Sequence, residues 1–196
     1  MNKRDLEFLY EIGTLRNIDR AWKQIMATDV ASDSEHTFRV VFLALLIARA
    51  EKVKDEEKII KMALVHDLAE ARTNDHHYVH SVYIKADEKK AADDIFAGTS
   101  LGDLNIGILR EFEERKSLES KIVKDADNLD VDLELREMDE RGLKLPKKFF
   151  KFRKLVRDEK LYTKTAKKLW DMIQKSDPAD WHLKANKFIK IPTAGK

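Results

Sequence analysis

Cysteine is absent from this 196-residue chain, and glycine and proline are scarce, at six and three residues. Without cysteine there are no disulfides, no thiolate chemistry and no cysteine-based zinc site, so any metal must be held by His, Asp or Glu. With 43% apolar and 38% charged residues, the composition is typical of a compact, helix-rich protein. The length fits one domain, and we therefore expect a single all-α domain over residues 1–196.

Long apolar segments are also missing. No stretch reaches the ~18 uninterrupted apolar residues of a membrane span, and the opening MNKRDLEFLYEIG lacks the apolar segment of a signal peptide. We therefore expect a soluble, cytoplasmic protein that makes no membrane contact.

Neither sign of charge is in large excess, because 38 basic and 36 acidic residues leave a net charge of +2. This balance argues against a nucleic-acid partner. The one basic concentration, residues 147–154, is interleaved with Phe149, Phe150 and Phe152. It predicts an amphipathic helix with a solvated face, and binding to a phosphate backbone is the alternative.

Apolar residues recur with helical spacing along the whole chain. Ser32 and Glu35 have the spacing of a capping box and mark the start of a strong helix that buries Val40 and Ile47. The expected helices cover residues 6–15, 21–26, 32–53, 55–71, 86–96, 103–114, 117–142, 148–157 and 163–173, and a basic tail follows them.

The stretch LVHDLAEARTND, residues 64–75, places polar side chains directly after an apolar run. On one continuous helix, His66, Asp67 and Glu70 share a single sector, which continues an inward-facing apolar stripe. Burying two carboxylates there without partners is costly, so the pattern calls for a cation or a compensating network.

Two further residues are candidates to complete a metal site. His36 lies four residues before Val40 on the apolar side of its helix, and Asp127 lies between Val123 and Val131 on another. With the adjacent His66 and Asp67 they form a set of two histidines and two aspartates. Such a set suits a borderline divalent ion such as Mn, Fe, Co, Ni or Zn.

The motifs SEHTFRV, ALVHDLAEARTND and KDADNLD, in this order, resemble the HD-domain phosphohydrolases, and most closely their 5'-deoxynucleotidase or oxetanocin-like subgroup. The resemblance covers about residues 15–135, and the segment 148–196 lies beyond it. It implies a helical bundle with a central site for one divalent ion, Mg included, held by His36, His66, Asp67 and Asp127. It also implies a homodimer.

The same resemblance assigns further roles. Glu70 and Asp75 fall on catalytic acids, with Asn74 replacing the usual glycine of the turn, and Arg20 and Trp22 fall on positions that hold the nucleotide. Asparagine tolerates the backbone conformation of such a turn, so the departure is mild.

Three histidines follow the motif, and His76 and His80 have the i, i+4 spacing of a helical metal pair. A second metal site there is conceivable, although the subgroup that the chain resembles uses one ion.

The expected activity is hydrolysis at phosphorus by water that a metal ion activates. The favoured function is a metal-dependent phosphomonoesterase that acts on deoxyribonucleoside 5'-monophosphates. One alternative keeps the enzyme class and changes the substrate to a cyclic, signalling or triphosphate nucleotide. The other is a non-catalytic scaffold of the same fold that binds nucleic acid through residues 147–154.

Overall fold

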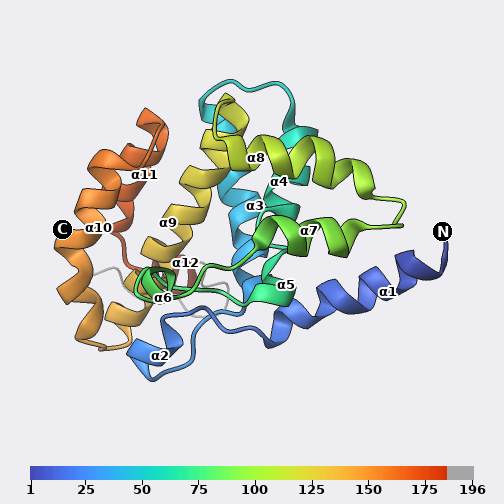
Figure 1. The fold of residues 1–196 in the computed structure, drawn as a ribbon. Coiled ribbons are helices and arrows are strands. Elements are labelled where there is room, and N and C mark those ends of the chain that lie inside the picture. Colours follow the sequence, from blue (N-terminus) through green and yellow to red (C-terminus); the bar gives the residue numbers. More distant parts are fainter. Residues whose placement is uncertain (185–196) are drawn as a thin grey trace, which may run out of the picture.

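The structure, a computed structural model, describes residues 1–184 and is built from helices (Figure 1). The helices in chain order are α1 (Lys3–Ile12), the 3-10 helix η1 (Gly13–Asn17), α2 (Lys23–Met26), α3 (Asp33–Ala50), α4 (Glu56–Val65), α5 (Glu70–Thr73), α6 (His80–Tyr83), α7 (Glu88–Phe96), the π-helical segment η2 (Leu104–Leu109), α8 (Arg110–Glu114), α9 (Leu118–Glu140), α10 (Leu145–Glu159), α11 (Lys164–Ile173) and α12 (Asp180–Lys184). The prediction of an all-α fold is confirmed for this part of the chain. None of its helices is long and apolar enough to cross a membrane.

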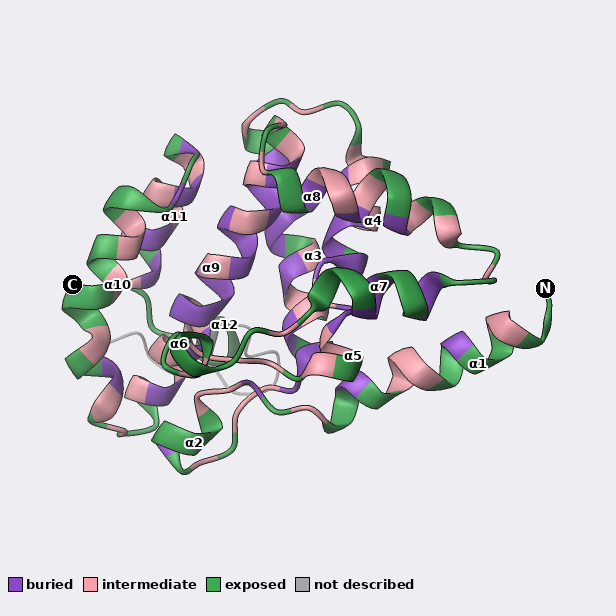
Figure 2. Cartoon of the chain, viewed as in Figure 1, coloured by how far each residue is buried: buried purple, intermediate pink, exposed green. Residues whose placement is uncertain are grey.

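The core lies where α3, α4 and α9 pack against one another, and their facing sides are buried (Figure 2). Fully buried aliphatic side chains fill this contact, and each contributes about 1.5–3 kcal/mol relative to an exposed position. They include Val40 and Ile47 of α3, Ile59 and Met62 of α4, and Ile122 and Leu129 of α9. The three elements that carry the candidate ligands are therefore fixed by the core itself.

Capping side chains set where the long helices begin. Ser32 accepts a hydrogen bond from the backbone N–H of Glu35, and the Glu35 carboxylate accepts one from the backbone of Ser32, which confirms the predicted capping box. Ser117 caps α9 and Thr163 caps α11 with a single bond each, accepted from the backbone N–H groups of Ser120 and Ala166. These caps fix the residue at which each helix begins, and with it the direction in which the side chains of the first turn point.

The prediction of one continuous helix over residues 55–71 is wrong. Helix α4 ends at Val65, and residues 66–69 form tight turns with i, i+3 hydrogen bonds before the short helix α5 begins. A local competition explains the break. The ring of His66 bonds the carbonyl oxygen of Ala63 at 2.8 Å, which is the acceptor that the N–H of Asp67 would use in a continued helix.

Helix α9 carries four buried aspartates, each with different partners. Asp125 accepts three hydrogen bonds from the start of α11, at 2.7 and 2.8 Å from two backbone N–H groups and 2.8 Å from the hydroxyl of Thr163. Asp132 accepts two from Arg153 of α10. These two carboxylates attach α10 and α11 to α9. Asp127 and Asp130 instead face His36 of α3.

Helix α10 contains the basic residues that the sequence singled out, and three of them already pair with acids. Lys147 lies 3.2 Å from Asp139, Lys154 lies 2.6 Å from Asp158, and Arg153 is turned inward against Asp132. The segment is an amphipathic helix, as predicted. The basic tail begins near the end of α12, and its residues 185–196 lie outside the described part.

Candidate metal centre

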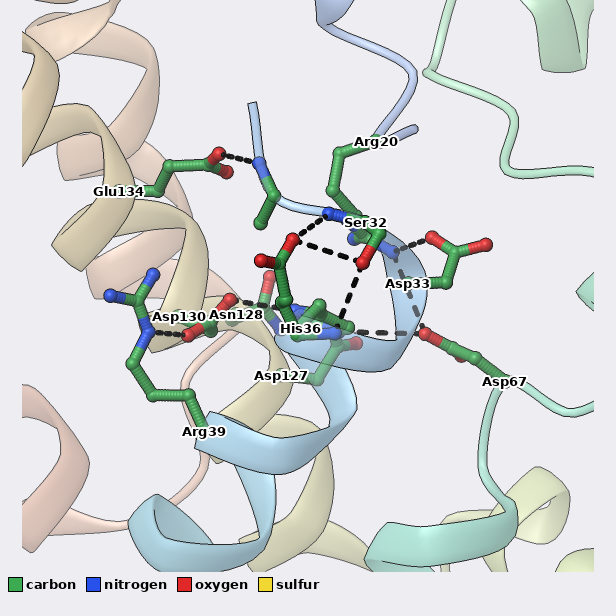
Figure 3. Close-up of polar contacts among 12 residues, drawn as sticks. Arg20, Ser32, Asp33, His36, Arg39, Asp67, Asp127, Asn128, Asp130 and Glu134 are labelled. Carbon is green, nitrogen blue, oxygen red and sulfur yellow. Dashed lines mark hydrogen bonds and ion pairs between the residues drawn. The ribbon is translucent and has the colours of Figure 1, made fainter. Parts of the chain in front are cut away.

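Four side chains from three places in the sequence meet at the centre of the bundle, and Figure 3 shows His36, Asp67 and Asp127 among them. His36 comes from α3, His66 and Asp67 from the turn after α4, and Asp127 from α9, and one ligand atom of each lies within 4.8 Å of all the others. The Nε2 atom of His36 is 3.5 Å from Asp67 Oδ2 and 3.4 Å from Asp127 Oδ1, and His66 Nε2 is 3.1 Å from Asp67 Oδ2. The structure therefore gathers all four residues that the sequence proposed as ligands.

The two imidazoles are oriented as metal ligands require. In each ring Nδ1 is hydrogen-bonded away from the cluster, His36 to the Asp130 carboxylate at 2.7 Å and His66 to the carbonyl of Ala63 at 2.8 Å. A carbonyl only accepts, so Nδ1 of His66 carries the proton, and the neutral ring then presents the lone pair of Nε2. Both Nε2 atoms are buried and have no hydrogen-bond partner.

A buried polar atom without a partner is costly unless something is bound there. Two such nitrogens beside two carboxylates form a mixed nitrogen and oxygen donor set, which fits a borderline divalent ion. The residues present therefore fit the ion that the sequence predicted.

Support for His36 comes from a chain of charged groups that the sequence analysis missed. Asp130 is buried and accepts hydrogen bonds from His36 and from Nε of Arg39, and Arg39 also pairs with Glu137 at 2.7 Å. A carboxylate behind a ligating histidine fixes its ring and raises its basicity. The available signal was the position of Asp130, three residues after Asp127 on the same helix.

The electrostatic field of the cluster attracts positive charge. Burial lowers the pKa of His36, but the neighbouring carboxylates of Asp127, Asp130 and Asp67 outweigh this, so the pKa lies well above the ordinary value. Burial raises the pKa of Asp67, yet the adjacent imidazoles of His66 and His36 hold it well below its usual range. In the absence of metal a proton thus satisfies the cluster, and a metal ion would compete with that proton for Nε2.

A second acidic group lies beside the first, made of Asp33, Glu70 and Asp75. The guanidinium of Arg20 joins the two groups, because its Nη1 is 3.4 Å from Asp33, 3.6 Å from Asp67, 3.8 Å from Glu70 and 3.2 Å from Asp75. Figure 3 shows Arg20 between Asp33 and Asp67. The sequence predicts Glu70 beside His66 and Asp67 on one helix. Because the helix is broken, the side chain of Glu70 lies in this neighbouring group instead.

Protonation in the second group follows from burial and crowding of like charges. Burial first, and then the charges of Asp67, Asp75 and Asp33, raise the pKa of Glu70 well above its usual range. Burial also raises the pKa of Asp33 to about 6. The sequence analysis missed Asp33, which looks like an ordinary first-turn acid of α3. At neutral pH Glu70 therefore holds a proton next to ionised carboxylates.

The remaining predicted residues border this second group. The carboxylate of Asp75 accepts the backbone N–H of Ala21 at 3.0 Å, so the T-N-D turn is attached directly to the segment that carries Arg20. Asn74 has a φ of 62° and a ψ of 163°, outside the left-handed helical region that asparagine tolerates and in a region that favours glycine almost exclusively, so the replacement of the usual glycine is less mild than the sequence predicts. Trp22 donates its indole N–H to Glu134 at 2.9 Å, and its ring centroid lies 5.3 Å from Cζ of Arg20.

The histidines after the motif form a separate cluster. His77 and His80 stack with ring centroids 3.7 Å apart, and His76 packs edge-on against His80 at 5.7 Å. Helix α6 begins only at His80, so the i, i+4 spacing of His76 and His80 does not lie on one helix. Within residues 1–184, these histidines belong to neither group of three or more potential ligands.

Replacing Asp130 by asparagine is expected to lower the pKa of His36, because the acceptor of its Nδ1 proton loses its charge. The folded-state pKa of His36 is raised above its ordinary value of 6.5. The charged ring therefore stabilises the metal-free protein fully below that value, and the contribution is lost as pH rises through the folded-state pKa. In the Asp130→Asn variant, the free energy of unfolding should fall less over the pH interval between the ordinary and the folded-state pKa of His36.

NMR titration of the His36 ring, together with urea unfolding at several pH values, measures both effects on metal-free protein. Asp103→Asn, which changes an exposed aspartate outside both acidic groups, is the matched control. An unchanged His36 titration in the Asp130 variant would contradict the assignment of Asp130 as its supporting carboxylate.

Comparison with known proteins adds a family match. A protein-family model described as HD domain matches residues 12–170. The chain is 30% identical over 141 residues to a protein of Danio rerio named 5'-deoxynucleotidase HDDC2, covering 69% of this chain and 70% of the relative. It is 31% identical over 157 residues to a Dictyostelium discoideum protein of the same name, covering 73% and 82%.

Solved structures share the fold. A conserved hypothetical protein from Pyrococcus furiosus superposes with a TM-score of 0.73 at 25% identity, covering 87% of this chain and 99% of that one. A predicted metal-dependent phosphohydrolase from Magnetospirillum magnetotacticum superposes with a TM-score of 0.68 at 20% identity, covering 88% and 90%.

Proposed function

We propose, from the premise that this chain belongs to the HD-domain family of metal-dependent phosphohydrolases, that it is a 5'-deoxynucleotidase. In this proposal it hydrolyses deoxyribonucleoside 5'-monophosphates to a deoxynucleoside and phosphate. The observation that carries the proposal is the buried cluster of His36, His66, Asp67 and Asp127 beside the group of Arg20, Glu70 and Asp75. The names of the two relatives support the choice of substrate.

His36, His66, Asp67 and Asp127 would hold one divalent ion, for which the two partnerless Nε2 atoms and two carboxylate oxygens provide the donors. When bound, such an ion polarises a phosphoryl oxygen and makes water acidic enough to attack near neutral pH. Its identity among Mn, Co, Fe, Ni, Zn and Mg is left open by a donor set of this kind.

Residues of the chain supply the other requirements of phosphate-ester hydrolysis. Arg20, which burial and its carboxylate neighbours hold in place, offers positive charge to the phosphate oxygens. Glu70, which holds a proton at neutral pH, would deliver it to the leaving 5'-oxygen. Asp75, fixed by the N–H of Ala21, would orient the attacking water.

The non-catalytic alternative depends on the basic helix α10. Of the five basic side chains in residues 147–154, three already pair with Asp132, Asp139 and Asp158, which reduces the positive charge available to a phosphate backbone. A scaffold would also have no use for the partnerless nitrogens at the bundle centre. These observations favour the enzyme.

A substrate panel tests the proposed function. With Mn²⁺ or Co²⁺ present, purified protein is expected to release phosphate from dAMP and dGMP faster than from AMP and GMP. Cyclic nucleotides and nucleoside triphosphates in the same panel test the other substrate classes, and chelation by EDTA tests the metal requirement. Hydrolysis of a triphosphate or cyclic nucleotide in preference to all monophosphates would contradict the proposal.

A further inference from the structure

Helix α3 carries an apolar stripe on the side that faces away from the core. Phe38, Phe42 and Leu46 follow one another at four-residue spacing and are 69%, 54% and 64% exposed. With 100° per residue they share a sector of about 80°, and they span about 12 Å along the helix axis. The ring centroids of Phe38 and Phe42 lie 5.3 Å apart, so the two rings form one continuous surface. Contiguous exposed apolar surface of this kind marks a site of association.

Charged residues of opposite sign end this α3 stripe. Glu35 lies seven residues before Phe42, Arg49 lies seven residues after it, and both are exposed. Around the helix axis each is about 20° from Phe42, so both continue the line of the stripe. The carboxylate of Glu35 bonds Ser32 through Oε2. Arg49 bonds Glu56 through Nε and Nη2. These bonds leave Oε1 of Glu35 and Nη1 of Arg49 available to a partner.

The order of these residues makes the α3 stripe complementary to itself in the antiparallel direction. A twofold axis at Phe42 places that residue against its own copy, and Phe38 of each chain against Leu46 of the other. The same rotation brings each Glu35 to an Arg49, whereas a parallel arrangement would place like charges together, which costs affinity. A twofold dimer needs a surface that pairs with itself in this way. The charges therefore select a second copy of the chain as the partner.

A groove of about 370 Å³ beside Phe38 enlarges this surface. Phe38 and Arg39 of α3 line it together with Met138 and Arg141 of α9. Stable interfaces bury about 800 Å² on each partner, which is more than three side chains of one helix provide. The stripe and the groove together therefore supply the contact, and none of the proposed metal ligands lines the groove.

We propose that two copies of this chain associate through the outer face of α3, with the helices antiparallel and Phe42 at the twofold axis. The resemblance in the sequence implies a homodimer without indicating its surface, whereas the α3 stripe fixes both the surface and the orientation. The proposal is independent of the proposed function, because it concerns the face of α3 that points away from the core and is tested without substrate or metal.

Sedimentation equilibrium of the full chain tests the surface. The native protein is expected to have the mass of two chains at a concentration of about 100 μM. Phe42→Glu places two carboxylates against each other at the axis, and Leu46→Glu places one against each Phe38. Each variant should raise the dissociation constant of the dimer about 100-fold or more, as loss of a central contact does. The replaced side chains are exposed, so both variants should keep the native helix content by circular dichroism.

Leu9→Glu is the matched control, because Leu9 is 54% exposed, as Phe42 is, and lies on α1. It should leave the dimer intact. A native protein that is monomeric at about 100 μM would overturn the proposal. So would a dimer that persists in Phe42→Glu and Leu46→Glu, or equal dissociation by Leu9→Glu.

Mixing two charge variants tests the orientation. Glu35→Lys and Arg49→Glu each bring like charges together at both ends of an antiparallel dimer, and each should weaken self-association about tenfold. An equimolar mixture of the two should recover the native affinity, because both ends of the mixed dimer again pair opposite charges. Recovery also separates charge pairing from loss of the capping box at Glu35, which mixing does not repair. Unchanged affinity in the two variants, or no recovery in the mixture, contradicts the antiparallel arrangement and overturns the proposal.

Discussion

Replacing Asp67 by alanine is expected to reduce phosphate release by about 10³-fold or more, because the change removes one of the four proposed metal ligands. Asp67 lies within 3.5 Å of both histidines of the proposed ligand set, and it also faces Arg20. Its loss therefore opens the cluster and frees the guanidinium at once.

Thermal unfolding distinguishes loss of metal from loss of fold. Mn²⁺ at about 100 times its dissociation constant stabilises a one-site protein by about 2.7 kcal/mol, which raises the melting temperature by about 5 °C or more for a chain of this size. The native protein and the control Asp103→Asn should show this shift, and Asp67→Ala should not. Full activity in Asp67→Ala, or an undiminished shift, would refute the assignment of Asp67 as a ligand.

Replacing Glu70 by glutamine is expected to lower kcat by about 10²- to 10⁴-fold while the metal remains bound. The glutamine keeps the shape of the side chain but has no acidic proton to deliver to the leaving oxygen. Burial and three neighbouring carboxylates keep that proton on Glu70 at neutral pH. In the native enzyme activity should therefore fall as pH rises through the raised pKa of Glu70, and the variant should lack this decline.

The Mn²⁺-induced rise in melting temperature should be retained in Glu70→Gln, because Glu70 belongs to the second acidic group and not to the ligand set. Glu57→Gln, on the surface of α4 with a side chain that is 76% exposed, is the matched control and should behave like the native protein. Near-native kcat in Glu70→Gln would exclude Glu70 as the acid. Loss of the metal-induced shift would indicate that it belongs to the ligand set.

Local patterns were sufficient to predict much of this protein from its sequence. Helical spacing of apolar residues predicted the fold class, and the capping box at Ser32 predicted the start of α3. The ordered motifs gave the family and the four candidate ligands. Such features lie within a few residues of one another, and local preferences and packing act on them in the same direction.

Tertiary contacts decided which residues hydrogen-bond to the candidate site residues, because the bonded residues are far apart in the chain. His36 and Asp130 are separated by 94 positions, and Trp22 and Glu134 by 112. No periodicity relates such residues. His36 and Asp130 meet because α3 and α9 pack together in the core, and Trp22 reaches Glu134 of α9 from the start of α2. The sequence alone therefore did not reveal Asp33, Asp130 or the pairing of Arg20 with Asp67, Glu70 and Asp75.

The break after α4 shows, within one motif, the same difference between what the sequence predicts and what the folded structure decides. Sequence spacing predicts a continuous helix through Glu70, and the adjacent His66 and Asp67 look like neighbours on its surface. The bond from the His66 ring to Ala63 takes the acceptor that the helix needs, and the folded turn sends Asp67 to the histidines and Glu70 to Arg20. The sequence alone determined which charged residues are available. The packing of distant helices decided which of them interact, since electrostatic interaction depends on distance in space and not along the chain.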